Sequence, residues 1–535
     1  MPATIGTILL FLAVLVAAAV AARRLQTAPS ILIVIAGVAL AVIPGLPRLE
    51  LAPELVLLGI LPPLIYSAGV AMSWREFRFN LRPITLLAFG CVIFTSGAVA
   101  AVTHFVLGMP LAVGFVLGAI VAPPDVVAPL AIVRRLGLPR RLVVVLEGEG
   151  LANDATALIL YRFAVAAVTT GVFSFTEAAG TFALIVVGEI GYGIGVGWIS
   201  LRLRRWARDP RVEITLSLMT PYVAFVVPAQ LGGSGVLATV AAGLFVSWNG
   251  PLLISAATRL QGIFFWDLLV YLLEGFVFLL TGMQMRTLLD RTDTILLRDL
   301  PLTILIVLAV IVAARFIWVF PATYLPRWLS PSLARRDPSP PWQWTFLLAF
   351  VGVRGVVSLA AALAIPLTKT DASSFPDRDL ILFVTFGVIV VTLIGQGLAL
   401  PSVVKRLALP RDAEDERRRE RDAEITARVE TLNVARDRVD RLAADGAVAP
   451  AVLTLLQARN DHRAKQVPRD RDGNRAVADA AELRANLIAA EREYIYRLLQ
   501  RGQITDEGRR RIERELDLEE ASLAFRRDSE DDPPL

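Results

Sequence analysis

The chain has 535 residues, of which 55% are hydrophobic and 19% charged, and its mean hydropathy of +0.60 indicates a polytopic membrane protein. One cysteine and two histidines exclude a disulfide framework and give no basis for a metal-binding cluster. The many arginines lie mostly in loops between apolar segments and in the C-terminal tail, which favours a cytoplasmic membrane face over nucleic-acid binding.

Thirteen apolar segments before residue 410 are predicted to cross the membrane as helices. They lie at about residues 4–22, 30–45, 54–71, 83–107, 111–133, 141–168, 178–201, 213–229, 235–249, 264–285, 300–325, 342–365 and 380–403. The first segment follows an uncharged start and precedes Arg23 and Arg24, the reverse of a signal peptide, so it is predicted to be a true span.

Loop charges predict the orientation. The loops after odd-numbered segments contain Arg23, Arg24, Arg75, Arg78, Arg82, Arg134, Arg135, Arg140, Arg141, Arg202, Arg204, Arg205, Arg208 and Arg211, whereas the early even-numbered loops contain only Arg48. The positive-inside rule then puts the N-terminus outside and the tail in the cytoplasm. Later loops discriminate less, because Arg286, Arg291 and Arg298 fall on the predicted outer side, and one span more or fewer there would reverse the tail.

The fifth and twelfth segments are interrupted. Pro123 and Pro124 precede Asp125 in the fifth, and Gly352 and Gly355 flank Arg354 in the twelfth. Broken helices at matching positions of two repeats are typical of a transporter site near the bilayer midplane. Asp125 would then balance the exposed N-terminal helix ends and Arg354 the C-terminal ends. The alternative is a proline kink together with an arginine that reaches the membrane interface.

The sixth segment contains Glu147-Gly148-Glu149-Gly150-Leu151-Ala152-Asn153-Asp154. A charge at bilayer depth costs at least about 2.5 kcal/mol and usually marks an ion or proton pathway. Helical spacing puts Glu147 and Asp154 on one face, and Glu149 with Asn153 on another. One face can therefore line a cavity while the other holds a partner within the bundle. A soluble helix with an acidic stripe is disfavoured, because the flanking segments are apolar on every face.

Three weaker signals follow. Ser234-Gly235-Val236-Leu237-Ala238 opens the ninth segment, where small residues favour close helix packing over a functional role. Glu274 and Arg315 lie inside the tenth and eleventh segments, and each is either a pathway residue or part of a structural polar contact.

The composition changes abruptly after Pro410. A membrane domain is therefore predicted at 1–410 and a charged, helical cytoplasmic tail at 411–535. Three roles for the tail stay open: regulation of transport, dimerisation, or only covering the cytoplasmic face. The tail carries no nucleotide or metal motif.

Residues 1–410 resemble the sodium/proton exchanger branch of the monovalent cation:proton antiporter superfamily. The motifs that carry the resemblance are Glu147-Gly148-Glu149-x-Leu151-x-Asn153-Asp154, Pro123-Pro124-Asp125, Ser234-Gly235-Val236-Leu237-Ala238, Arg354 with Gly355-Val356-Val357-Ser358-Leu359, and Thr392-Leu393-Ile394-Gly395-Gln396-Gly397. The tail resembles those of bacterial members more loosely.

The resemblance implies an all-α membrane protein of thirteen spans with an inverted repeat, working in the plasma membrane as a homodimer with core and dimerisation domains. It implies that Asp154 binds the transported cation or proton beside Asn153, and that Glu149 forms a structural pair with Arg354. It implies no cofactor beyond the transported ions.

Four positions depart from the pattern of many members. Pro124 stands where many have Thr, Val126 where they have Pro, Gly150 where they have Ser, and Ser67 where Glu is frequent. Those side chains help to bind sodium in relatives, so the complete ligand set, with Glu147, Gly150 and Pro124 as accessory positions, stays open.

The function expected from these residues is exchange of Na⁺ for H⁺ by alternating access, because a carboxylate such as Asp154 can hold a proton or a cation but not both at once. Asn153 cannot titrate, so one proton is expected to exchange for one sodium ion. One alternative is a K⁺/H⁺ antiporter of the same fold, and another is a gated cation channel or membrane sensor. An enzyme is disfavoured, because no nucleophile–base pair or histidine cluster occurs in the sequence.

Overall fold

The computed structural model describes residues 2–25, 27–43, 52–289, 294–407, 409–444, 449–465, 471–501 and 503–531. Within these ranges the chain is almost wholly helical, and β-pairing is limited to one isolated bridge between Thr368 and Ser374. The chain divides into two compact units, Met1–Leu409 and Pro410–Leu535. Arg48 and Arg291, which entered the prediction of orientation, lie outside the described residues.

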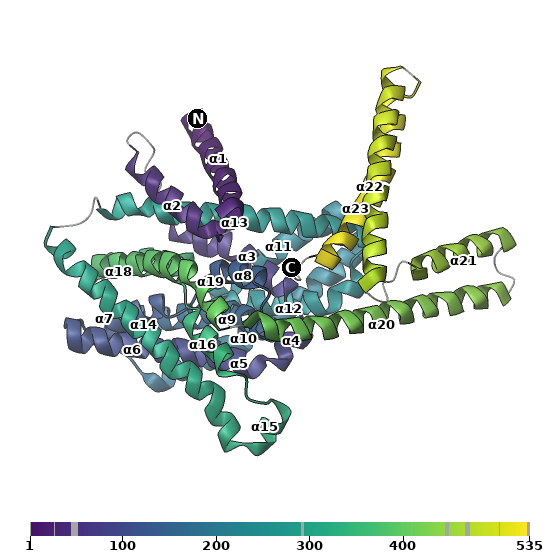
Figure 1. Ribbon diagram of the computed structural model, residues 1–535. Helices are drawn as coiled ribbons and strands as arrows, with labels where there is room; N and C mark the ends of the chain where they lie inside the picture. Colours follow the sequence, from purple (N-terminus) through teal and green to yellow (C-terminus); the bar gives the residue numbers. More distant parts are fainter. Residues whose placement is uncertain are drawn as a thin grey trace. The chain divides into compact units, whose positions relative to one another are not determined.

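The described part of the first unit contains nineteen α-helices and three π-helical segments (Figure 1). They are α1 (Pro2–Leu25), α2 (Pro29–Val42), η1 (Leu55–Ile60), α3 (Leu61–Ala71), α4 (Trp74–Phe79), α5 (Leu81–Thr85), η2 (Leu86–Cys91), α6 (Val92–Leu107), α7 (Leu111–Val121), α8 (Val127–Arg135), α9 (Arg140–Thr170), α10 (Phe175–Ala207), α11 (Pro210–Gln230), α12 (Val236–Leu253), α13 (Ala256–Leu289), α14 (Thr294–Leu329), α15 (Pro331–Arg336), α16 (Trp342–Phe350), α17 (Val356–Leu363), α18 (Arg378–Val391), η3 (Thr392–Gln396) and α19 (Gly397–Arg406).

The all-helical membrane fold is confirmed. Among the described residues, nine helices are long and apolar enough to cross a bilayer by length and composition, and shorter apolar helices lie at Pro29–Val42, Leu55–Ala71 and Leu111–Val121. Every one of the thirteen predicted segments contains a helix or an interrupted pair of helices. The number of crossings, thirteen, stays a prediction.

Both predicted interruptions are present. Residues 122–126 separate α7 from α8, and residues 351–355 separate α16 from α17. Proline explains the first break, since Pro123 and Pro124 donate no backbone hydrogen bond. The two breaks contact each other directly, because the backbone N–H of Asp125 donates to the carbonyl oxygen of Val353 at 2.6 Å. Two non-helical stretches thus lie side by side inside a helical bundle.

The helices of this unit form two packed groups. In one, α7 packs on α6, α9 and α17, while α14 packs on α6, α16 and α18. In the other, α12 packs on α3, α10 and α11, and α2 lies along α13, as Figure 1 shows. Contacts of α9 with α3 and α12, and of α17 with α13, join the groups. The interrupted helices and α9 therefore belong to one group and face the other.

Glycine pairs allow close packing within the second group. A Cβ atom on Gly69 of α3 would lie 3.3 Å from the Cα of Gly243 on α12. A Cβ on Gly37 of α2 would lie 3.0 Å from the Cα of Gly282 on α13. Without water to drive association, membrane helices rely on such close backbone contact.

The second unit contains α20 (Leu409–Ala444, whose first residue belongs to the first unit), α21 (Pro450–Lys465), α22 (Arg471–Gln500) and α23 (Asp506–Asp531). Ile488 and Ile495 of α22 pack against Leu516 of α23 in a small apolar core. Arg484 also pairs with Glu519 at 2.7 Å across the two helices. These contacts hold α22 and α23 together as a helical hairpin.

Candidate ion-binding site

Asp154 lies on the wall of a cavity of about 960 Å³ in the first unit. Glu147 and Gly150, from the same helix, also line it, as do Pro124 and Asp125 from the break between α7 and α8. The opposite wall comes from α3, α11, α12 and α13. Asp154 is therefore accessible at the junction of the two helix groups, beside an interrupted helix.

Asn153 faces away from this cavity and is fully buried. Its side-chain Nδ2 donates to the carbonyl oxygen of Pro124 at 2.7 Å. A carbonyl in a broken helix lacks its usual intrahelical donor, so the amide of Asn153 supplies one. This bond ties α9 to the break directly before Asp125.

Asp125 and Arg354 lie at helix ends. The Asp125 carboxylate accepts from the N–H of Val127 at 2.9 Å, at the start of α8. Arg354 Nε donates to the carbonyl oxygen of Val121 at 2.8 Å, at the end of α7, and its guanidinium also bonds the carbonyl of Gly352. The negative Asp125 thus accepts from an N–H group at a helix start, and the positive Arg354 donates to a carbonyl group at a helix end. These are the backbone groups that a helix terminus leaves unpaired.

The predicted pairing of Glu149 with Arg354 is wrong. Glu149, fully buried, forms a bidentate pair with Arg315 of α14, at 2.6 and 2.8 Å. Arg315 Nε also donates to the carbonyl oxygen of Leu348 at 3.1 Å. The guanidinium of Arg354 is instead engaged by carbonyls of the breaks, so the arginine from α14 is the one that reaches Glu149. Helical spacing on α9 identified the buried face but could not identify the helix opposite it.

Glu147 has a more open setting. Its carboxylate pairs with Arg134 of α8 at 2.8 Å, and the Arg134 side chain is 47% exposed. This contact joins α9 to the end of α8, and both residues line the cavity.

Gly150 packs against Val126, so two of the departures from the family pattern are neighbours. A Cβ on Gly150 would come within 3.0 Å of Cγ1 of Val126 and closer still to Cγ2. The valine thus occupies the space that a larger residue at position 150 would need. Ser67 also lines the cavity, and its hydroxyl donates to the Leu64 carbonyl oxygen at 3.4 Å.

A family model described as "Sodium/hydrogen exchanger, transmembrane" matches residues 10–406. The chain belongs to the sodium/hydrogen exchanger family. An uncharacterised Na⁺/H⁺ exchanger of Mycobacterium tuberculosis is 34% identical over 98% of this chain and 97% of its own length. A sodium, potassium, lithium and rubidium/H⁺ antiporter of Bacillus subtilis is 29% identical over 86% of this chain and 69% of its own length.

Solved structures support the fold. The sodium proton antiporter MjNhaP1 of Methanocaldococcus jannaschii aligns with a TM-score of 0.58 at 20% identity, over 76% of this chain and 97% of its own. A second structure of the same antiporter, at pH 8, gives a TM-score of 0.55 at 18% identity, over 75% and 98% of the two chains. At these identities the likeness is one of fold.

In this exchanger the Ser234–Ala238 motif does more than pack. The Glu189 carboxylate of α10 accepts from the N–H groups of Ser234, Gly235 and Leu237 and from the Ser234 hydroxyl, so it caps the start of α12. Gly235 has a φ of +73°, which other residues rarely adopt. The signal for this cap was an acid at position 189 within an apolar segment, which the sequence analysis did not single out.

Three further carboxylates line the exchanger's cavity, and one of them is Asp267 of α13. Glu274 of α13, a candidate pathway residue in the sequence analysis, lies on the wall opposite α9. Glu213 of α11, which the sequence analysis did not single out, is buried, and one of its oxygens has no hydrogen-bond partner among the described residues. The cavity wall therefore offers acidic groups besides Asp154.

Proposed function

We propose that this exchanger couples the exit of Na⁺ to the entry of H⁺ by alternating access, with Asp154 as the carboxylate for which the two ions compete. The observation that supports this role most directly is the position of Asp154, on the wall of a cavity between two helix groups and beside a broken helix. Carboxylate and carbonyl oxygens are the hard ligands that suit such a cation. Carbonyls freed near the break at 122–126 would complete the site with Asp154.

In this proposal Asn153 is a positioning residue. Its hydrogen bond to the Pro124 carbonyl holds the break against α9. Asp125 and Arg354 compensate the helix ends, and Glu149 with Arg315 fixes α9 to α14. Of the motif residues, only Asp154 and Glu147 then present a carboxylate to the cavity from α9.

The cavity is proposed to open toward the cytoplasm. Its wall includes Arg134, Arg204 and Arg259, which lie near helix ends or loops assigned to the cytoplasmic side by the positive-inside rule. The structure would then correspond to an inward-facing state, in which Asp154 exchanges its ion with the cell interior.

Substitution of the proposed competing carboxylate is the first test. Asp154→Asn should abolish sodium-driven proton movement in liposomes, because an amide can neither release a proton nor balance a cation. Asp379→Asn is the matched control, since Asp379 is an exposed carboxylate at the start of α18 and should leave exchange unchanged. Retained exchange in Asp154→Asn protein of normal fold would remove Asp154 from the mechanism.

The stoichiometry is proposed to be one proton per sodium ion. Asn153 is an amide, so the Asn-Asp pair contains one titratable group, and no net charge moves in a cycle. Equilibrium sodium gradients measured in liposomes at several clamped membrane potentials should therefore coincide. A shift with potential would mean that another carboxylate of the cavity wall carries a second charge, and electroneutral exchange would be rejected.

The choice between Na⁺ and K⁺ has a specific alternative. The Bacillus subtilis relative is named as an antiporter of sodium, potassium, lithium and rubidium, and Gly150, Pro124 and Ser67 lack side chains that help to bind sodium in other members. In vesicles prepared without potassium, proton movement should nevertheless begin at a lower concentration of added Na⁺ than of added K⁺. The reverse order would favour a K⁺/H⁺ antiporter.

We also propose a homodimer in the plasma membrane, with the N-terminus outside and the tail in the cytoplasm. The dimer rests on the resemblance to the antiporter superfamily, and the arginine-rich odd loops support the orientation. A reporter that works only in the cytoplasm should be active when it is fused after residue 410. An active alkaline phosphatase at the same position would reverse the orientation.

A further inference from the structure

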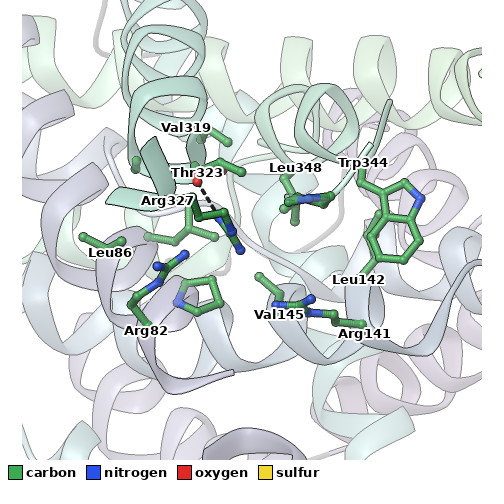
Figure 2. Close-up of a pocket in the computed structure, with 14 residues that line it drawn as sticks. Arg82, Leu86, Arg141, Leu142, Val145, Val319, Thr323, Arg327, Trp344 and Leu348 are labelled. Atoms are coloured by element: carbon green, nitrogen blue, oxygen red, sulfur yellow. Dashed lines mark hydrogen bonds between the residues drawn. The ribbon is translucent and has the colours of Figure 1, made fainter. Parts of the chain in front are cut away.

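A second pocket lies outside the ion cavity, among α5, η2, α9, α14 and α16. It has a volume of about 50 Å³, enough for a few water-sized groups. Arg82, Arg141 and Arg327 line it from three different helices, and Figure 2 shows Arg327 with Thr323 on α14 near Arg82, and Trp344 with Leu348 on another wall. We refer to it as the arginine pocket.

The arginine pocket has excess positive charge. Its three arginines all contact the carboxylate of Asp337, at 3.5 Å from Arg82, 2.6 Å from Arg141 and 2.7 Å from Arg327. No acidic residue is among the described residues that line the pocket itself. Three guanidinium groups against one carboxylate leave two formal positive charges uncompensated by these contacts.

Arg82 also has unused donors. Its Nε and Nη1 are buried and have no hydrogen-bond partner within the described part of the chain. Buried donors of a charged group are almost always satisfied, because leaving them unpaired is costly. Guanidinium groups match the oxygens of a phosphate particularly well. An anionic oxygen ligand would therefore satisfy Arg82 and reduce the excess charge.

The remaining walls are apolar. Leu86, Leu142, Val145, Val319 and Leu348 line the pocket beside the arginines. A free phosphate ion would gain nothing from such walls, whereas a phospholipid has hydrocarbon directly attached to its headgroup. Arg82 and Arg141 follow odd-numbered segments, so on the proposed orientation they face the cytoplasmic leaflet, where anionic lipids attract basic groups.

We propose that the arginine pocket is a binding site for the phosphate headgroup of an anionic phospholipid, whose chains lie along the apolar wall. The site belongs to the helix group that carries α9, and it is separate from the cavity that contains Asp154. A lipid there would hold together α5, α9 and α14 at their arginine-bearing ends.

Native mass spectrometry of the full-length, delipidated exchanger tests this site. Phosphatidylglycerol should bind more tightly than phosphatidylcholine with identical acyl chains. Arg82→Gln should weaken phosphatidylglycerol binding about fivefold, as expected for loss of one basic contact, and leave phosphatidylcholine binding unchanged. Arg78→Gln is the matched control, since Arg78 is exposed on the neighbouring α4 and the charge change is identical.

Two more variants separate binding from folding. Arg82→Lys keeps the charge and should retain most of the binding, while Ala322→Trp fills the pocket without altering charge and should weaken it. Equal affinity for the two lipids, or equal loss in Arg82→Gln and Arg78→Gln, would overturn the proposal. Displacement of phosphatidylglycerol by millimolar inorganic phosphate would also overturn it, because the site would then be one for a free anion.

Discussion

Glu147 and Glu149 are separated by one residue of α9, yet their side chains have different surroundings. Glu149 is fully buried with Arg315, whereas Glu147 pairs with a half-exposed Arg134 on the wall of the cavity. Removing one partner of a buried pair leaves an uncompensated charge, while exposed pairs contribute little. Residue type alone therefore does not determine what each glutamate does.

Glu149→Gln should destabilise the exchanger by about 3–5 kcal/mol, because Arg315 is left buried without its carboxylate. Thermal unfolding in detergent measures the effect. Glu147→Gln is the control on the same helix, with an expected change of about 0–1 kcal/mol, because the released Arg134 guanidinium stays in contact with water. Equal unfolding temperatures for the two variants would contradict a structural role of the Glu149–Arg315 pair.

Gly150→Ala should also destabilise the protein, by about 1–3 kcal/mol, because the new methyl group meets the stiff side chain of Val126. Adding Val126→Ala should restore most of the loss. Gly188→Ala on α10 provides the comparison, since a Cβ there meets nothing within 4 Å and alanine favours the helix. A Gly150→Ala protein as stable as the parent would show that Val126 yields without cost.

At the scale of whole elements, helix ends inside the bundle are compensated by charged side chains that lie in the breaks or on another helix. Asp125 meets the start of α8, Arg354 meets the end of α7, and Glu189 meets the start of α12. Unpaired backbone groups are costly where water is absent, so interrupted helices persist only with such partners. These contacts make the breaks stable parts of the fold.

Glu189→Gln should lower the stability of the exchanger by about 1–3 kcal/mol, because several buried donors at the start of α12 lose an ionised acceptor. Glu177→Gln, an exposed position on the same α10, should leave the unfolding temperature nearly unchanged. Thermal unfolding of the two purified variants makes the comparison. If both behave like the parent, the cap contributes no net stability.

At the scale of the whole molecule, the chain forms two compact units that join near residue 409. The cavity, the interrupted helices and the arginine pocket are all built from residues of the first unit. The second unit has its own apolar core between α22 and α23. This arrangement supports the hypothesis that the first unit carries out exchange and that the tail only modulates it.

Truncation after Glu414 should therefore leave sodium-driven proton movement measurable in liposomes, with at most a changed dependence on pH. Equal amounts of inserted full-length and truncated protein must be compared, and Asp154→Asn in the truncated chain provides the inactive baseline. Complete loss of exchange in a well-inserted truncated protein would assign the tail an essential role.

The sequence by itself determined the helical membrane fold, the family and the positions of both helix breaks. Hydropathy, consecutive prolines and charges within apolar segments are local properties, and bilayer physics limits what such segments can do. Periodicity along α9 also separated the face of Asp154 from that of Glu149. These conclusions needed no knowledge of which helices are neighbours.

Only the tertiary structure decided which residues meet. It paired Glu149 with Arg315 and not Arg354, brought Glu189 to the start of α12, and placed Val126 against Gly150. It also gathered Arg82, Arg141 and Arg327 around Asp337. Each contact joins residues far apart in the chain or on different elements, and helical spacing fixes only the direction in which a side chain points. Which residue that side chain contacts depends on how the helices pack against one another.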